Sequence, residues 1–138
     1  MSVWLRIFKK GSGRPSITIA EALDVVLCWG WIDGIRKGLD ERSYLQRYTP
    51  RRPRGIWSQI NREHVARLTK AERMTPHGQR QVVAAKADGR WSSAYAPMRA
   101  ASDENFPADL RAAIEARPRA RKTFQSLGRR NRFALAFR

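Results

Sequence analysis

The sequence has little cysteine, little histidine and few acidic residues, and each scarcity narrows the functions open to it. Its only cysteine, Cys28, cannot form an internal disulfide, which fits a reducing compartment. Its two histidines, His64 and His77, fall on separate predicted helices, so the clustered ligands of a metal site are missing. Asp33 has no acidic neighbour with which to share acid–base catalysis. We therefore expect no metal, no cofactor and no enzymatic activity.

Long apolar runs are also missing. No segment approaches the roughly 18 consecutive apolar residues of a membrane-spanning helix. Near the N-terminus, Arg6, Lys9 and Lys10 interrupt the apolar segment that a secretion signal would need. We therefore expect a cytoplasmic protein without a membrane span. The length of 138 residues fits one domain with a short appendage and is enough to bury a hydrophobic core.

What the chain has in excess is positive charge. Its formal net charge is +16, and 22 of its 28 basic residues are arginine. Such a charge is typical of proteins that bind nucleic acid or an anionic surface. Arginine, alanine, glycine and proline also share GC-rich codons, so genome composition is an alternative source of the excess. We expect at least non-specific, salt-sensitive adhesion to nucleic acid, because phosphate contacts need little more than arginine.

Local signals predict a small sheet in the first half of the chain. Three segments alternate with the period of a strand: Val3 to Phe8, Trp31 to Gly38 and Arg42 to Thr49. Thr18 and Glu21 have the spacing of a capping box, which predicts a helix over about residues 19–29. Gly30 suits the left-handed conformation that ends a helix. The second and third strands follow one another closely and predict a hairpin.

Later helices are predicted from their start signals, which are Ser58, Thr75 with Pro76, Pro107, Pro118 and Asn131. Residues 91–105 have no clear period and indicate a loop or linker. Together the patterns predict an α+β fold, in which a small antiparallel sheet packs against helices and a helical C-terminal segment follows. We place the α+β domain at residues 1–104 and the helical segment at 105–138.

The spacing of several motifs matches that of a known family. The motifs are Trp4 to Gly13, Cys28 to Lys37, Tyr48 to Pro53, Trp57-Ser58 with Asn61, Met74-x-Pro76-x-Gly78 and Ala85 to Trp91. Together they resemble the YdeI/OmpD-associated family, also known as bacteriocin-protection proteins. The resemblance implies an α+β domain, no established catalytic activity or cofactor, and a role in resistance to envelope stress or cationic peptides. It also implies a truncated C-terminal segment, and the chain departs from the family at Glu72, where relatives commonly have glycine.

A set of polar and aromatic residues falls on the two hairpin strands and the start of the next helix. It comprises Trp31, Asp33, Arg36, Arg47, Thr49, Arg51, Trp57, Ser58 and Asn61. Arg36 and Arg47 can present planar guanidinium groups to a carboxylate or phosphate, and a helix start at Ser58 adds backbone donors. The set therefore predicts an anion pocket. The alternative is structural: Asp33 pairs with Arg36 or Arg47, and the set only stabilises the fold.

These observations favour a non-enzymatic binding protein with a role in stress protection, whose partner is a small anionic ligand or an acidic protein. One alternative is a nucleic-acid-binding protein that uses the basic C-terminal tail and the Arg51 to Arg54 loop. Another is an unrecognised enzyme that uses Asp33 or Cys28.

Overall fold

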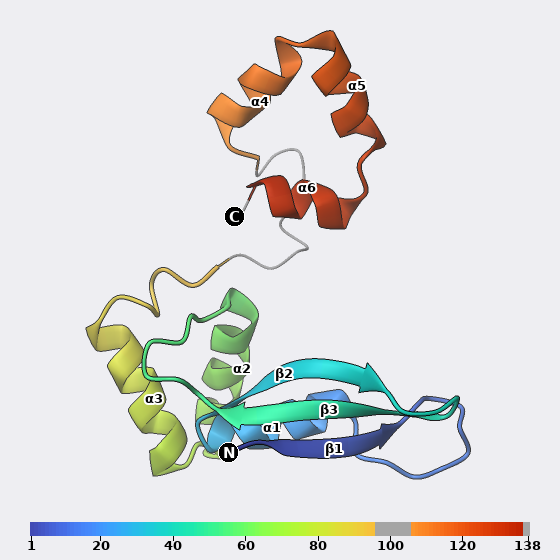
Figure 1. Cartoon of the computed structure of the whole chain (residues 1–138). Helices are drawn as coiled ribbons and strands as arrows, with labels where there is room; N and C mark the ends of the chain where they lie inside the picture. Colours follow the sequence, from blue (N-terminus) through green and yellow to red (C-terminus); the bar gives the residue numbers. More distant parts are fainter. Residues whose placement is uncertain (96–105, 137–138) are drawn as a thin grey trace. The chain divides into compact units, whose positions relative to one another are not determined.

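The computed structural model describes residues 1–95 and 106–136 and has the predicted α+β fold (Figure 1). Within these residues the chain forms one three-stranded antiparallel sheet and six helices. It divides into two compact units, Met1–Trp57 with Asn61–Ala94 and Ser58–Ile60 with Tyr95–Arg138. The boundary predicted between residues 104 and 105 lies outside the described residues.

The sheet of the first unit has its last strand in the centre. It consists of β1 (Val3–Phe8), β2 (Trp31–Gly38) and β3 (Ser43–Pro50), in the order β1-β3-β2. β3 pairs antiparallel with both neighbours. The predicted hairpin is confirmed, and its second strand is shifted by one residue at each end.

The two faces of this sheet differ in burial. Ile7, Gln46 and Tyr48 share one face and are only 2%, 3% and 1% exposed. We call it the inner face; α1 (Ile19–Cys28) packs against the sheet in contact with β2. Apart from the fully buried Ser43, the outer face carries half-buried or exposed side chains, among them those of Trp4, Arg6, Phe8, Lys37, Leu45, Arg47 and Thr49.

A β-bulge interrupts β2 between Asp33 and Arg36. Asp33 lies opposite Tyr48 and Arg36 lies opposite Gln46, so β2 advances by three residues over the length in which β3 advances by two. Because directly opposed residues share a face, Asp33 and Arg36 both belong to the inner face. The buried Gln46 amide donates to the carbonyl oxygens of Gly34 and Ile35, at 3.0 and 3.4 Å. It thereby satisfies backbone groups at the bulge.

The capping box of α1 is confirmed. The backbone N–H of Glu21 donates to Thr18 Oγ1 at 3.2 Å, and the N–H of Thr18 donates to the Glu21 carboxylate at 2.8 Å. Gly30 has the predicted positive φ, 76°. The hydrophobic core of this unit includes Leu27 from α1, Leu68 from α2 (Gln59–Lys70) and Ala85 from α3 (Pro76–Ala87). α1 therefore contributes both to this core and to the cover of the sheet.

Thr75 joins the end of α1 to the start of α3. Its hydroxyl donates to the Cys28 carbonyl at 2.6 Å, and its backbone N–H donates to the same oxygen at 3.1 Å. The hydroxyl also accepts from the Gly78 N–H, which makes Thr75 the predicted N-cap. This brings the first turn of α3 so close to α1 that a Cβ on Gly78 would lie 2.3 Å from the Cys28 carbonyl oxygen. Only glycine fits there.

The end of α2 places a side chain where glycine is favoured. Glu72 has φ of 55°, and Glu72 and Arg73 donate to the carbonyls of Thr69 and Leu68, both at 3.0 Å. These two bonds form a Schellman motif with Glu72 at its left-handed position. A residue with a Cβ is strained in this conformation.

We expect Glu72→Gly to raise the free energy of unfolding by about 0.5–1 kcal/mol, because relief of the left-handed strain outweighs the added chain entropy. Urea denaturation measures it. Ala71→Gly is the control: its φ is outside the left-handed region, so it should lower the free energy of unfolding. Equal effects of the two substitutions would contradict the assigned strain.

The second unit contains α4 (Ala108–Glu115), α5 (Pro118–Ser126) and α6 (Arg129–Ala136). The predicted starts are confirmed for α4 and α5, while α6 begins two residues before Asn131. Phe106 and Phe124 meet edge to face at 4.9 Å between centroids, and the Arg132 guanidinium lies 4.9 Å from the Phe124 ring. No helix among the described residues is long and apolar enough to cross a membrane.

Candidate functional site

The structure separates the nine residues of the predicted pocket. Asp33 and Arg36 lie on the inner face of the sheet, whereas Arg47 and Thr49 lie on the outer face. Arg47, Thr49 and Arg51 do come together in one hollow. The other six predicted residues are not part of its lining.

The hollow lies beside the end of β3 and has a volume of about 540 Å³. Its lining consists of Met1, Gly34, Ile35, Arg47, Thr49, Pro50, Arg51, Arg52 and Pro53. Three arginines thus line it, and none of the described residues in its wall is acidic. The local field is therefore positive, and it favours an anion.

Arg51 is the most firmly held of the three arginines. It is 8% exposed, its backbone N–H donates to the Gly30 carbonyl at 3.0 Å, and its Nη1 donates to the Ile56 carbonyl at 3.3 Å. Its guanidinium lies 3.6 Å from the centroid of the Trp57 ring. A cation stacked in this way is fixed in position and retains its charge.

Arg47 and Arg52 are less restrained. Arg47 comes from the middle of β3, and its buried Nε has no hydrogen-bond partner among the described residues. Arg52 is exposed in the loop after β3. Neither side chain forms an ion pair with an acid in the described part of the chain. Both can therefore offer a charged fork to an incoming carboxylate or phosphate.

Arg36 has a different environment on the inner face. Its Nε donates to Gln46 Oε1 at 3.3 Å, and its guanidinium lies 4.6 Å from the Tyr44 ring centroid. Burial, and after it the charge of Asp33, raises the pKa of the Tyr48 hydroxyl. Asp33 is exposed, and no ion pair within 4.0 Å joins it to Arg36 or Arg47, all of which are described. The structural alternative of an Asp33 ion pair is therefore not what the fold contains.

The remaining predicted residues have structural surroundings. Trp57 is 3% exposed and packs on Trp91 at 4.9 Å between ring centroids, so it supports Arg51 from the core. Trp31 is half-buried opposite Pro50. Ser58 directly precedes α2 and forms a β-bridge with Tyr95, and Asn61 lies in the first turn of α2.

The predicted pocket did not include Gly34 and Ile35, nor Arg52, which was predicted only as part of the basic loop of the nucleic-acid alternative. Arg52 stands next to Arg51 in a run of arginine and proline, and a count of alternating positions along β3 places Arg47 and Thr49 on one face. The two signals together could have indicated the hollow. The part played by Gly34 and Ile35 depends on the bulge, which has no clear sequence signature.

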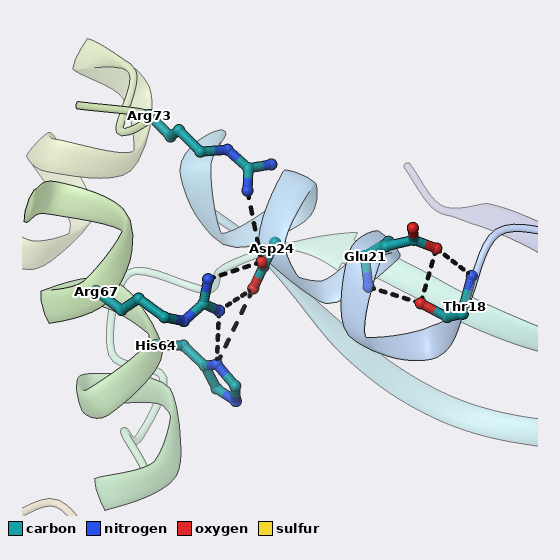
Figure 2. A network of polar contacts seen from close by, with 6 residues as sticks. All are labelled: Thr18, Glu21, Asp24, His64, Arg67 and Arg73. Atoms are coloured by element: carbon teal, nitrogen blue, oxygen red, sulfur yellow. Dashed lines mark hydrogen bonds and ion pairs between the residues drawn. The ribbon is translucent and has the colours of Figure 1, made fainter. Parts of the chain in front are cut away.

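A second polar cluster links α1 to α2 and was not predicted (Figure 2). Asp24 is 14% exposed and accepts from Arg67 through both of its oxygens, at 3.0 and 2.5 Å. Arg73 lies 3.6 Å from it, and His64 Nδ1 lies 4.0 Å from it. The hydrogen bonds from Arg67 lower the pKa of Asp24. Asp24 is thus ionised and saturated by cations, which indicates a structural role.

Cys28 is 4% exposed, and burial raises the pKa of its thiol. The thiol is therefore protonated near neutral pH, which does not support its use as a nucleophile.

Comparison with known proteins finds a match to a family model. The model of a family described as a domain of unknown function, DUF8412, matches residues 1–81. These residues include the sheet, α1, α2 and the first half of α3. No curated protein and no solved structure matches the chain. The resemblance to the YdeI/OmpD-associated family therefore stays a prediction.

Proposed function

The chain belongs to the DUF8412 family, whose function is unknown, and we propose a function from the geometry of the hollow and from the resemblance noted above. The protein binds a small anionic ligand, without catalysis, in the hollow lined by Arg47, Arg51 and Arg52. In line with the resemblance noted above, this binding serves stress protection in the cytoplasm.

The observation that carries the proposal is a hollow lined by three arginines, with no acidic residue in its described wall. The volume of about 540 Å³ lies within the range of small-molecule sites. Thr49 adds a hydroxyl that can donate to a ligand oxygen. A di- or tricarboxylate or a phosphate ester has the charge and size that this lining fits.

We expect Arg47→Ala and Arg52→Ala each to weaken binding of pyrophosphate or citrate by about tenfold, because each removes a charge-assisted hydrogen bond. Isothermal titration calorimetry of the full chain measures the dissociation constants. Arg36→Ala is the matched control, since it removes the same charge from the other face of the same sheet. It should change the affinity by less than about twofold.

Two results would contradict the proposal. One is a loss of affinity in Arg36→Ala equal to that in Arg47→Ala, which would show that only the overall charge matters. The other is the absence of saturable binding of either anion at millimolar concentration.

A further inference from the structure

The outer face of the sheet combines exposed aromatic rings with basic side chains. Trp4 is 37% exposed, and Phe8 is half-buried four residues further along β1, or about 13 Å away at the usual rise of a strand. Their rings lie on the same side as Leu45 and Arg47 of the neighbouring strand. Trp4 is not among the buried residues of the core, so a binding partner could cover the exposed part of its ring.

Each of the two rings has a cation close to it. Lys37 Nζ lies 5.3 Å from the centroid of the Trp4 ring, and the Arg6 guanidinium lies 4.7 Å from that of Phe8. Arg6 is already paired with Asp40 at 2.8 Å, so Trp4 with Lys37 is the better candidate of the two. No carboxylate side chain comes from the outward positions of the three strands, all of which are described. A ring beside a cation on a strand fits a base and its phosphate, since the base can stack while the phosphate meets the charge.

The outer face continues into the hollow. Arg47 lies directly opposite Trp4 in the β1·β3 pairing and also lines the hollow with Arg51 and Arg52. A positive path therefore runs from Trp4 and Lys37 to the three arginines. The other end of the face is mixed in charge, because Asp40 and Glu41 line a second hollow there together with three arginines.

We propose that the ligand of this surface is a single-stranded nucleic acid, which stacks a base on Trp4 and places a backbone phosphate in the arginine-lined hollow. The proposal rests on the proposed function, since it names the source of the anion. A duplex fits less well because its bases are stacked on one another and cannot stack on a side chain. A single strand offers a base and a phosphate in every nucleotide, and this repeating pair matches a ring that stands beside basic side chains.

Fluorescence anisotropy of the full chain with a labelled oligouridylate of about 12 nucleotides tests the proposal at about 0.15 M salt. We expect saturable binding that Trp4→Ala weakens between about fivefold and a hundredfold, the usual effect of removing one stacked base contact. Trp4→Phe should keep most of the affinity, because phenylalanine retains a ring. Neither substitution alters the charge of the protein. A loss of affinity in Trp4→Ala that Trp4→Phe largely restores would therefore show that the ring stacks on a base.

Trp29→Ala is the matched control, because Trp29 is 53% exposed, stacks on His77 of α3 and belongs to none of the three strands. It should bind the oligonucleotide like the unmodified chain. A duplex of the same sequence should bind more weakly than the single strand. Inorganic polyphosphate should bind to the Trp4 variants as tightly as it binds to the unmodified chain, because it has no base to stack.

Binding that Trp4→Ala and Trp29→Ala leave equally strong would overturn the proposal, as would tighter binding of the duplex. In either case, unchanged binding of pyrophosphate and its loss in Arg47→Ala would show that the hollow still takes a small anion. If the unmodified chain does not bind pyrophosphate at all, the proposed function itself is contradicted.

Discussion

The Gly78→Ala variant is expected to lose at least about 3 kcal/mol of the free energy of unfolding, at the upper end of the usual cost of overpacking. The added Cβ would lie 2.3 Å from the carbonyl oxygen of Cys28 and 2.9 Å from that of Leu27. Both obstacles are backbone atoms, so no side chain can rotate away. Either α3 must move off α1, which breaks the bonds from Thr75 to Cys28, or the end of α1 must unwind.

Thermal and urea denaturation of the variant measure this loss, which corresponds to a fall in Tm of about 12 °C or more. Gly38→Ala is the matched control: it makes the same chemical change where nothing lies within 4 Å of the added atom. We expect it to alter the free energy of unfolding by less than about 0.5 kcal/mol. Similar stabilities of the two variants would show that α1 and α3 are not packed as described.

Asp24→Asn should have the second-largest effect on stability, a loss of about 1–2 kcal/mol at neutral pH. Asparagine keeps the size of the side chain but removes the charge that holds the two hydrogen bonds from Arg67 and the nearby Arg73. Hydrogen bonds to charged groups contribute about 1.5–3 kcal/mol, and we place the loss lower because Arg67 is half-exposed to water.

The effect of Asp24→Asn should depend on pH. Because folding lowers the pKa of Asp24, its carboxylate stabilises the native state above the unfolded pKa of about 3.9. That contribution is lost as the pH falls through the lower, folded-state pKa. The stability difference between the unmodified chain and the variant should thus be constant above about pH 5 and shrink below about pH 4.

Urea denaturation at several pH values between 3 and 7 measures this dependence. Hydrogen bonds also lower the pKa of Glu21, Asp40 and Asp88, so the unmodified chain loses stability in acid for several reasons. Those losses are common to both proteins and cancel in the difference. Glu41→Gln, which neutralises an exposed carboxylate of the hairpin turn, is the control and should show no comparable loss. A difference for Asp24→Asn that stays constant down to pH 3 would contradict the assigned ionisation.

The local signals in the sequence were sufficient to predict most of the fold. Thr18 with Glu21, Gly30, and Thr75 with Pro76 each act through contacts with near neighbours, and each boundary is where its pattern predicts. The alternating segments likewise predict three strands, because one face of the sheet is buried and the other is not. These features depend on short-range physics, which a single sequence records.

The candidate site was only partly predictable, and the bulge in β2 is the main reason. Strict alternation after Asp33 would put Arg36 on the face opposite to that of Asp33. The extra residue of the bulge returns Arg36 to the inner face, where it meets Gln46 instead of Arg47. The stabilising bonds from Gln46 to the bulge connect residues on different strands. Neither the bulge nor the Asp24 cluster has a local pattern, because both depend on tertiary neighbours.

The two hydrogen bonds that Thr75 donates to the Cys28 carbonyl have a consequence for the order in which the molecule folds during synthesis. Cys28 and its donor are 47 positions apart, so α1 and all three strands have already been synthesised before Thr75 is added to the chain. Until then the Cys28 carbonyl at the end of α1 lacks the hydrogen bonds from Thr75, and Gly78 of α3 is not yet packed against it. These contacts can therefore form only after Thr75 and the first turn of α3 have been synthesised, which places them late in the assembly of the first unit.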